Sequence, residues 1–316
     1  MMNKKAIIFG ISGLSLTKKE KTFFKNFKPW GIILFSRNIK NIPQLKKLIS
    51  QIKYIFRDKN YPILIDQEGG KVSRINKIID LSFFSQHFFS ELYKNNKKVF
   101  LNFYKIYIDK VCEIFKKTGI NINTVPVLDV QTKKTHKIIG TRSFSNNPAI
   151  VSKLGKLCIN FYHNNKIATA IKHLPGHGES KEDSHNETPI VNASKKILTE
   201  KDFKPFIRSK SLFGMTAHVI YSSYDSDSTA THSKKIIREI IRRKIKFKGI
   251  LMSDDISMKS LKYKLEINAI RALNSGCNLV LHCNGKMSEM IRLAKVIPNI
   301  DNFTKEKTYQ FYKFLR

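Results

Sequence analysis

The chain has 316 residues, of which 41% are hydrophobic and 11% aromatic, and this composition excludes a disordered or low-complexity protein. No apolar run reaches the roughly 18 residues that a membrane-spanning helix requires, so we expect no membrane partner. The formal net charge of +34, from 58 Lys and Arg against 24 Asp and Glu, would by itself favour nucleic acid or another polyanion as a partner.

The distribution of the basic residues argues against that partner. They are spread over nearly every predicted helix, and no nucleic-acid-binding motif accompanies them. Lys, Asn, Ile and Phe are abundant whereas Gly, Ala and Pro are scarce, a skew typical of A/T-rich coding. We therefore interpret the basic residues as solvent-exposed side chains distributed over the whole surface, and we expect no specific nucleic-acid partner.

The N-terminus and the cysteines both indicate a reducing compartment. Lys4 and Lys5 followed by the apolar run 6–16 resemble a signal peptide, but Gly10 and Gly13 interrupt the run and no A-x-A-like cleavage site follows. We interpret this run as a first buried strand, which predicts a cytoplasmic protein. The four cysteines form no C-x-x-C pair and are expected to be reduced thiols.

Short, β-branched apolar runs alternate along the chain with longer amphipathic runs, which predicts buried strands separated by helices. The predicted strands are Ala6–Ile11, Gly31–Phe35, Pro62–Asp66, Asn123–Asp129, Ala168–His173, Gly214–Ile220, Gly249–Asp254 and Asn278–His282. The predicted helices are Thr17–Phe27, Ile42–Phe56, Asn96–Thr118, Ala149–Asn164, Leu198–Ser209, Ser233–Ile245 and Leu265–Ser275.

Eight strands with intervening helices over about 300 residues predict an α/β fold, a single (β/α)8 TIM barrel. The alternative is an open doubly wound sheet, which should carry a glycine fingerprint in its first turn. The segment from Gly10 to Gly13 is not such a fingerprint, and Gly69 and Gly70 follow the third strand rather than the first. No linker divides the chain, so we expect one catalytic domain over residues 1–316.

Polar residues gather at the carboxyl ends of the predicted strands, where barrel enzymes build their active sites. One or two such residues would be explained as caps or satisfied polar groups, whereas six strand ends favour a functional cluster. The residues are Asp66, Asp129, Lys172, His173, His218, Asp254, Asp255 and His282.

The segment after the fifth predicted strand, residues 172–185, is the most informative, because histidine and acidic side chains are concentrated in it. Pro175, Gly176 and Gly178 exclude a helix, so we predict a long loop over the barrel mouth. His173 and His177 are four residues apart but cannot share a helical face as zinc ligands do, because Pro-Gly lies between them. We therefore expect no metal.

Asp183 and His185 are two residues apart, so the carboxylate can fix the imidazole tautomer and stabilise its charged form. This pair predicts a general acid/base. Its partner would be Asp254, because a rigid strand end suits a carboxylate nucleophile. In the alternative interpretation of Ser253-Asp254-Asp255, an aspartate caps the following helix.

A series of motifs in the right order and spacing resembles the β-hexosaminidases of glycoside hydrolase family 3, in particular single-domain bacterial β-N-acetylglucosaminidases. The resemblance runs through nearly the whole chain. Its motifs are Gly31–Asn38, Asp66–Arg74, Pro126–Asp129, Ile139–Phe144, Lys172–Gly178, Asp183–His185, Met215–His218 and Ser253–Met258.

The resemblance implies that Asp254 is the nucleophile and that His185, oriented by Asp183, is the proton donor and acceptor. It also implies a set of residues that hold the terminal sugar: Asp66, Arg74, Arg142, Lys172 and His173.

Three departures from the family pattern stand outside the proposed catalytic positions. Thr141 replaces an acid or amide, Leu174 a Phe, and Lys71 an Arg. They bear on affinity rather than on the reaction class.

The resemblance implies retaining removal of terminal β-1,4-linked N-acetylglucosamine from GlcNAc–anhydro-muramyl fragments in cell-wall recycling, with consequences for cell shape and division. We expect no cofactor and a monomer. Two alternatives stay open. One is a glycoside phosphorylase or β-glucosidase on the same barrel, since a histidine acid/base would let phosphate approach. The other is a basic barrel without catalysis that binds nucleic acid or another anion.

Overall fold

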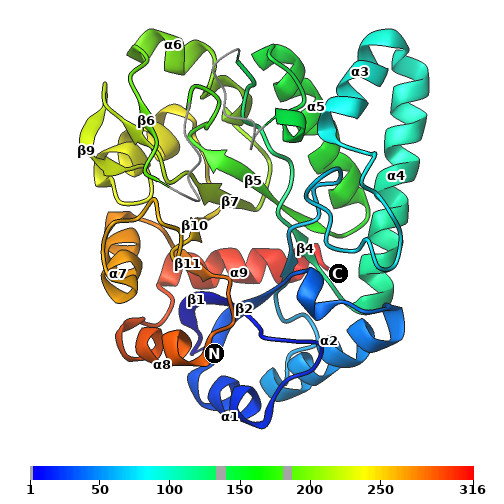
Figure 1. Cartoon of the computed structure of the whole chain (residues 1–316), viewed down its shortest axis with the longest axis vertical. Coiled ribbons are helices and arrows are strands. Elements are labelled where there is room, and N and C mark those ends of the chain that lie inside the picture. The colour runs from blue at the N-terminus through cyan, green and yellow to red at the C-terminus, as the bar shows by residue number, and fades with distance from the viewer. Residues whose placement is uncertain (1–2, 133–139, 181–186) are drawn as a thin grey trace.

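All eight predicted apolar runs form parallel strands, and they close into a barrel in the order β1-β11-β10-β7-β5-β4-β3-β2 (Figure 1). The computed structural model describes residues 3–132, 140–180 and 187–316. The barrel strands are β1 (Lys5–Gly10), β2 (Pro29–Leu34), β3 (Ile63–Ile65), β4 (Ile122–Asn123), β5 (Ala168–Leu174), β7 (Phe213–Thr216), β10 (Ile250–Asp255) and β11 (Leu279–His282). The predicted fold class is confirmed.

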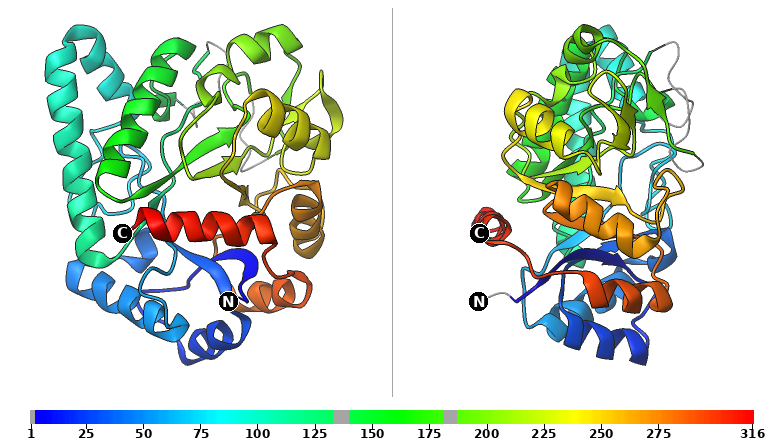
Figure 2. Two further views of the ribbon diagram at one scale, coloured as in Figure 1. Left: turned by 180° about the vertical axis from the view of Figure 1, so that it is seen from behind. Right: turned by 90° about the vertical axis from the view of Figure 1, so that its left-hand side faces the viewer.

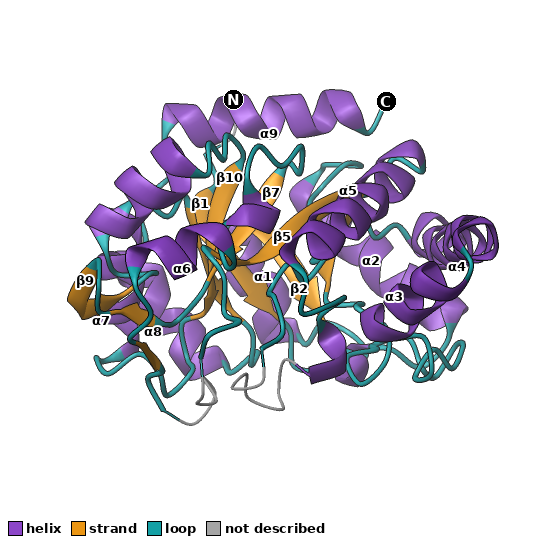
Figure 3. Ribbon diagram, turned by 90° about the horizontal axis from the view of Figure 1, so that it is seen from above, coloured by secondary structure: helices purple, strands orange, loops and turns teal. Residues whose placement is uncertain are grey.

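Helices surround the strands on the outside of the barrel (Figure 3). Their ends follow local capping chemistry: Thr17 and Glu20 form a reciprocal capping box at the start of α1. The helices are α1 (Lys18–Phe27), α2 (Ile42–Phe56), α3 (Gln86–Asn95), α4 (Lys97–Thr118), α5 (Pro148–Asn164), α6 (Lys195–Glu200), α7 (Leu265–Ser275), α8 (Met287–Val296) and α9 (Asn302–Phe314), with a π-helix at Ile236–Lys244.

Three predicted elements were too long. The run 123–129 is a regular strand only at its start; Pro126 has no N–H to donate, and beyond it a single bridge joins Val127 to Lys172. The predicted helix 198–209 is instead the end of α6 and a 3₁₀ turn containing Pro205. The predicted strand 214–220 leaves the barrel after Thr216, and its last residue begins β8 (Ile220–Tyr221) in a small sheet with β6 (Ile190–Val191) and β9 (Asp225–Thr229). Helices α3, α8 and α9 were not predicted.

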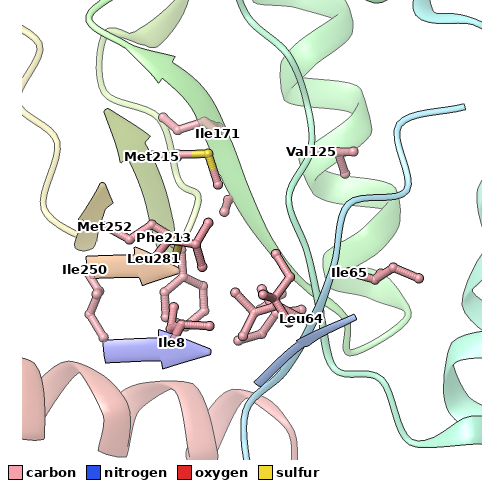
Figure 4. Close-up of a cluster of buried hydrophobic side chains, with 14 of the residues drawn as sticks. Ile8, Leu64, Ile65, Val125, Ile171, Phe213, Met215, Ile250, Met252 and Leu281 are labelled. Atoms are coloured by element: carbon pink, nitrogen blue, oxygen red, sulfur yellow. The ribbon is translucent and has the colours of Figure 1, made fainter. Parts of the chain in front are cut away.

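The barrel interior is filled with apolar side chains, among them Ile8, Leu64, Phe213, Ile250 and Leu281 (Figure 4). This filling is the normal condition of a TIM barrel, whose centre is a packed core rather than a pore.

Helix α9 lies against the end of the barrel where the strands begin (Figure 2). Trp30 and Phe213, from the starts of β2 and β7, pack against Phe311 of α9 with ring centroids 6.5 and 5.3 Å away. The Trp30 indole donates to Thr308 at 2.8 Å. A ligand site must therefore lie at the carboxyl ends of the strands. Among the described residues, no helix has the length and apolar character needed to cross a membrane.

Candidate active site

A cavity of about 160 Å³ opens at the carboxyl ends of the strands. Apolar side chains from the barrel core form part of its wall, and the rest includes charged side chains from β5, β10 and the segment that follows β3. The lining residues are Ile33, Phe35, Asp66, Arg74, Arg142, Lys172, His173, His177, Met215, Asp254, Asp255, Met258, Leu281 and Cys283. The five predicted sugar-holding residues and the predicted nucleophile thus lie together around one cavity.

Five charged side chains along one side of this cavity form a chain of alternating sign, which we call the charged ladder: Arg74, Asp66, Lys172, Glu68 and Arg142. Asp66 accepts from Arg74 at 2.8 Å and also from Lys172. Lys172 contacts Glu68 at 2.6 Å, and Arg142 donates to both oxygens of Glu68 at 2.7 and 2.8 Å. The pairs Arg74–Asp66, Lys172–Asp66 and Arg142–Glu68 are charge-assisted hydrogen bonds, the strong class of polar contact in proteins, and Lys172–Glu68 is an ion pair.

The ladder fixes the charge of its members. Burial raises the pKa of Asp66, but the nearby Lys172 and Arg74 outweigh burial and leave this pKa well below its usual range. Burial likewise raises the pKa of Glu68, and Arg142 with Lys172 reverses the effect. For Lys172 burial lowers the pKa, and the two carboxylates raise it overall. All these groups are ionised at neutral pH.

Glu68 was not predicted as a site residue. Glu68 follows the end of β3 in the same motif as Asp66. A charged residue directly after a fully apolar strand is the sequence feature from which its place in the site could have been predicted. Its side chain is 1% exposed, so it belongs to the ladder without lining the cavity. The intervening Gln67 holds the loop instead, accepting from the backbone N–H of Arg74 at 2.7 Å.

Asp254, the last residue but one of β10, faces the ladder across the cavity with a side chain 22% exposed. Its Oδ1 accepts from the backbone N–H of Asp255 at 2.8 Å, and its Oδ2 lies 3.9 Å from Nε2 of His173. Burial raises the pKa of Asp254, but His173 and His218 lower it overall. The carboxylate is ionised and accessible, as a nucleophile must be.

Asp129 holds the start of the loop after β5. This fully buried carboxylate accepts from Nδ1 of His173 at 2.7 Å and from the backbone N–H groups of His173 and His177 at 3.2 and 2.8 Å. The contact to Nδ1 fixes the ring so that Nε2 faces Asp254. Asp129 therefore acts through His173 and does not reach the cavity.

Two further strand-end residues, His218 and His282, do not line the cavity, so the polar cluster predicted at six strand ends reaches the cavity from three of them. His218 lies behind Asp254, contacting Thr231 at 2.7 Å. His282 pairs with Glu289 at 2.8 Å in a fully buried position. Both make structural hydrogen bonds that the sequence pattern cannot distinguish from ligand contacts.

Asp255 has a structural role beside Asp254. Its Oδ1 accepts from the backbone N–H and the hydroxyl of Ser257 at 3.1 and 2.9 Å. The capping interpretation thus applies to Asp255, although it caps a turn, since the next helix starts only at Leu265. Asp254, by contrast, accepts one hydrogen bond among the described residues.

His177 is a buried imidazole at the edge of the cavity. Its Nδ1 has no hydrogen-bond partner among the described residues, and burial lowers its pKa to about 4, so it is neutral at physiological pH. The predicted acid/base pair, Asp183 and His185, lies outside the described residues. On either side of that stretch, Gly178 N–H donates to Asp202 at 3.1 Å and Thr188 donates to the carbonyl of Ser260 at 2.8 Å.

Within the described part of the chain, no group of three or more His, Cys, Asp or Glu side chains has the arrangement of a metal site. The carboxylates of the cavity contact cations and N–H donors instead. The cavity offers hydrogen-bond donors and acceptors around an ionised carboxylate, an arrangement suited to a ligand rich in hydroxyls.

Comparison with known proteins identifies the family. Residues 7–309 match the glycosyl hydrolase family 3 N-terminal domain. A β-hexosaminidase of Actinobacillus succinogenes is 32% identical over 88% of this chain and 80% of its own length, and one of Haemophilus influenzae is 33% identical over 88% and 79%. The crystal structure of NagZ from Neisseria gonorrhoeae in complex with N-trifluoroacetyl-D-glucosamine superposes with a TM-score of 0.88 and 28% identity, covering 100% of this chain and 91% of that one. The chain therefore belongs to glycoside hydrolase family 3, and it is a glycoside hydrolase.

Proposed function

We propose that this protein is a retaining β-N-acetylglucosaminidase that removes terminal β-1,4-linked N-acetylglucosamine from muropeptide fragments during cell-wall recycling. The observation that carries the proposal is the ionised, partly exposed Asp254 facing the charged ladder across a cavity closed by the barrel core. Support comes from the relatives named β-hexosaminidases and from the N-trifluoroacetyl-D-glucosamine bound by the Neisseria protein.

The ladder and the neighbouring His173 supply the contacts for the terminal sugar. Asp66, Arg74 and Arg142 of the ladder and His173 beside it present charged or polar groups that hydroxyls and an acetamido group can bind. Nε of Arg74 is buried without a partner among the described residues, so a ligand oxygen would satisfy it. Lys172 acts through its charge, because its three N–H donors already face Asp66, Glu68 and Thr124.

The proposed reaction has two steps. A carboxylate oxygen of Asp254 attacks the anomeric carbon, the bond to the leaving oxygen breaks, and His185 gives that oxygen its proton. Water then attacks the same carbon while His185 takes its proton, and Asp254 leaves as a carboxylate. Asp183 orients His185 throughout.

We further propose that residues 1–316 form one catalytic domain that works as a monomer in the cytoplasm. Support comes from the barrel, in which each strand pairs with two neighbours, and from the cavity-lining residues of the proposed site, which all belong to this one barrel. Loss of this activity would disturb cell-wall recycling and, through it, cell shape and division.

The test is the release of N-acetylglucosamine from a GlcNAc–1,6-anhydro-N-acetylmuramic acid fragment, followed by chromatography with and without phosphate. We expect free N-acetylglucosamine, formed first as the β-anomer by proton NMR. A sugar 1-phosphate as the main product would make the enzyme a phosphorylase. Faster cleavage of a nitrophenyl glucoside than of the N-acetylglucosaminide would make it a β-glucosidase.

A further inference from the structure

Glu68 lies directly behind the cavity wall and contacts two of the cations that line it. Its carboxylate is buried, and it lies at the edge of a separate small internal cavity walled by aromatic residues such as Tyr107 and Tyr162. A buried ionised group in such surroundings is costly unless cations pair with it. Its partners therefore indicate what it does.

Those partners are Arg142 and Lys172. Arg142 approaches with two parallel N–H groups, at 2.7 Å to Oε2 and 2.8 Å to Oε1, and Lys172 contacts the same Oε1 at 2.6 Å. One carboxylate oxygen thus holds two positive charges close together. Without that oxygen, the two cations would repel each other across a poorly solvated wall.

The backbone around Glu68 is also held in place by specific contacts. The Glu68 N–H donates to Val72 at 2.9 Å, and the following Gly69 has a positive φ of 89°. A Cβ at Gly69 would lie 2.3 Å from the carbonyl oxygen of Phe84 and 2.6 Å from the hydroxyl of Tyr107. Only glycine permits this close approach, so the carboxylate is rigidly mounted.

We propose that Glu68 is a positioning residue for the glycosidase reaction: it sets the direction of Arg142 toward the hydroxyls of the terminal sugar and holds the Lys172 charge at a fixed spacing from Arg142. Glu68 does not touch the sugar. The inference rests on the proposed function, because it assumes that this side of the cavity binds a monosaccharide. A role in binding, rather than in bond cleavage, follows from its distance from Asp254 around the barrel: β3 and β10 lie on opposite sides.

The test compares Glu68→Gln with the matched control Glu20→Gln. Glu20 is also buried, at 2% exposure, and its carboxylate accepts hydrogen bonds from Ser12 and Thr17 in the capping box of α1. Both substitutions keep the volume and remove one charge. Each variant is assayed with 4-nitrophenyl N-acetyl-β-glucosaminide for kcat and KM, for the inhibition constant of N-acetylglucosamine, and for its melting temperature.

For Glu68→Gln we expect KM and the inhibition constant of N-acetylglucosamine to rise together by about 10-fold or more, with kcat changed by about 3-fold or less. Glu20→Gln should lower the melting temperature and leave both constants near the wild-type values. A fall in melting temperature for Glu68→Gln with unchanged KM and inhibition constant would overturn the inference.

A double-variant cycle tests whether Glu68 acts through Arg142. If it does, Glu68→Gln combined with Arg142→Met should weaken N-acetylglucosamine binding little more than Arg142→Met alone. Full additivity of the two losses would contradict the inference. The wild-type protein separates this result from failure of the proposed function: wild type that neither binds N-acetylglucosamine nor cleaves its glycoside refutes the function, whatever the Glu68 variants do.

Discussion

The two sides of the cavity differ in how far their charges are paired before any ligand arrives. After β3, Asp66 has hydrogen bonds from Arg74, Thr124 and Lys172. Across the barrel at the end of β10, Asp254 has one hydrogen bond, from the backbone of Asp255, and a histidine nitrogen at 3.9 Å, among the described residues.

We infer from this difference that the two sides of the cavity have separate roles, one in binding the sugar and the other in the reaction. Paired charges with short contacts need no reorganisation when a sugar binds, so the ladder suits recognition. A carboxylate with few hydrogen bonds keeps lone pairs available, so Asp254 suits attack on carbon. Asp129 lies on neither side of the cavity. It orients His173, which lines the cavity between the ladder and Asp254.

The largest effect should come from the reactive side. Asp254→Asn removes the nucleophile, and we expect kcat to fall on the order of 10⁴-fold with little change in melting temperature. Asp255→Asn, which changes a carboxylate whose contacts are to Ser257 and to the backbone of Cys283, should cost far less activity. Trapping with a 2-fluoro or 5-fluoro glycosyl donor and peptide mass mapping should label Asp254. A label on Asp255, Glu68 or Glu179 would refute the assignment.

The next largest effect concerns His185, whose role depends on the leaving group. His185→Ala should slow hydrolysis of natural disaccharides by roughly 10²- to 10⁴-fold, because their leaving oxygen needs a proton. Glycosylation from a dinitrophenyl glycoside should suffer much less, and added azide should accelerate turnover. Equal losses on both substrates without azide rescue would show that the acid lies elsewhere.

A smaller effect, on stability, should appear on acidification. Burial holds the pKa of His177 at about 4, and desolvation does the same for His163 and His232, whereas an unfolded histidine titrates near 6.5. Between these values the unfolded chain binds more protons, so stability falls as pH is lowered from about 6.5 to about 4.

Below that pH window we expect a second loss of stability, from Asp66, Glu68 and Asp129, whose pKa values are lowered in the folded protein. The stabilisation from these carboxylates is fully present above the pKa of an unfolded carboxyl group and disappears as they are protonated. Melting temperature measured from pH 7 to pH 3 at constant ionic strength checks both steps. A melting temperature that stays constant or rises between pH 6.5 and 4 would contradict the first.

The smallest effect is expected from polyanions. If the net charge of +34 comes from solvent-exposed side chains distributed over the surface, RNA binding should be independent of RNA sequence and should disappear at moderate salt. Hydrolysis of an uncharged nitrophenyl substrate should be nearly unaffected by added RNA. Strong inhibition by RNA at near-physiological salt would instead place a functional basic surface at the cavity mouth.

The sequence by itself determined the eight barrel strands and several of the polar residues that line the cavity. The apolar runs that became strands are buried on both faces, so their local pattern alone marks them. Asp66, Lys172, His173 and Asp254 could be predicted because each stands where such a run ends, which in a barrel is the rim of the site.

The tertiary structure decided which of those strand-end residues face the cavity. Asp129, His218 and His282 occupy equivalent places in the sequence but turn toward hydrogen-bond partners in other elements, and Glu68 gains its role only because the loop carrying Arg142 folds against β3 and β5. Most of these contacts join residues well separated in the chain, as in the 74 positions between Glu68 and Arg142, although His282 and Glu289 are only 7 positions apart. A local pattern cannot encode them, because the choice between a ligand and a buried partner depends on which side chains the closed barrel brings within hydrogen-bond distance.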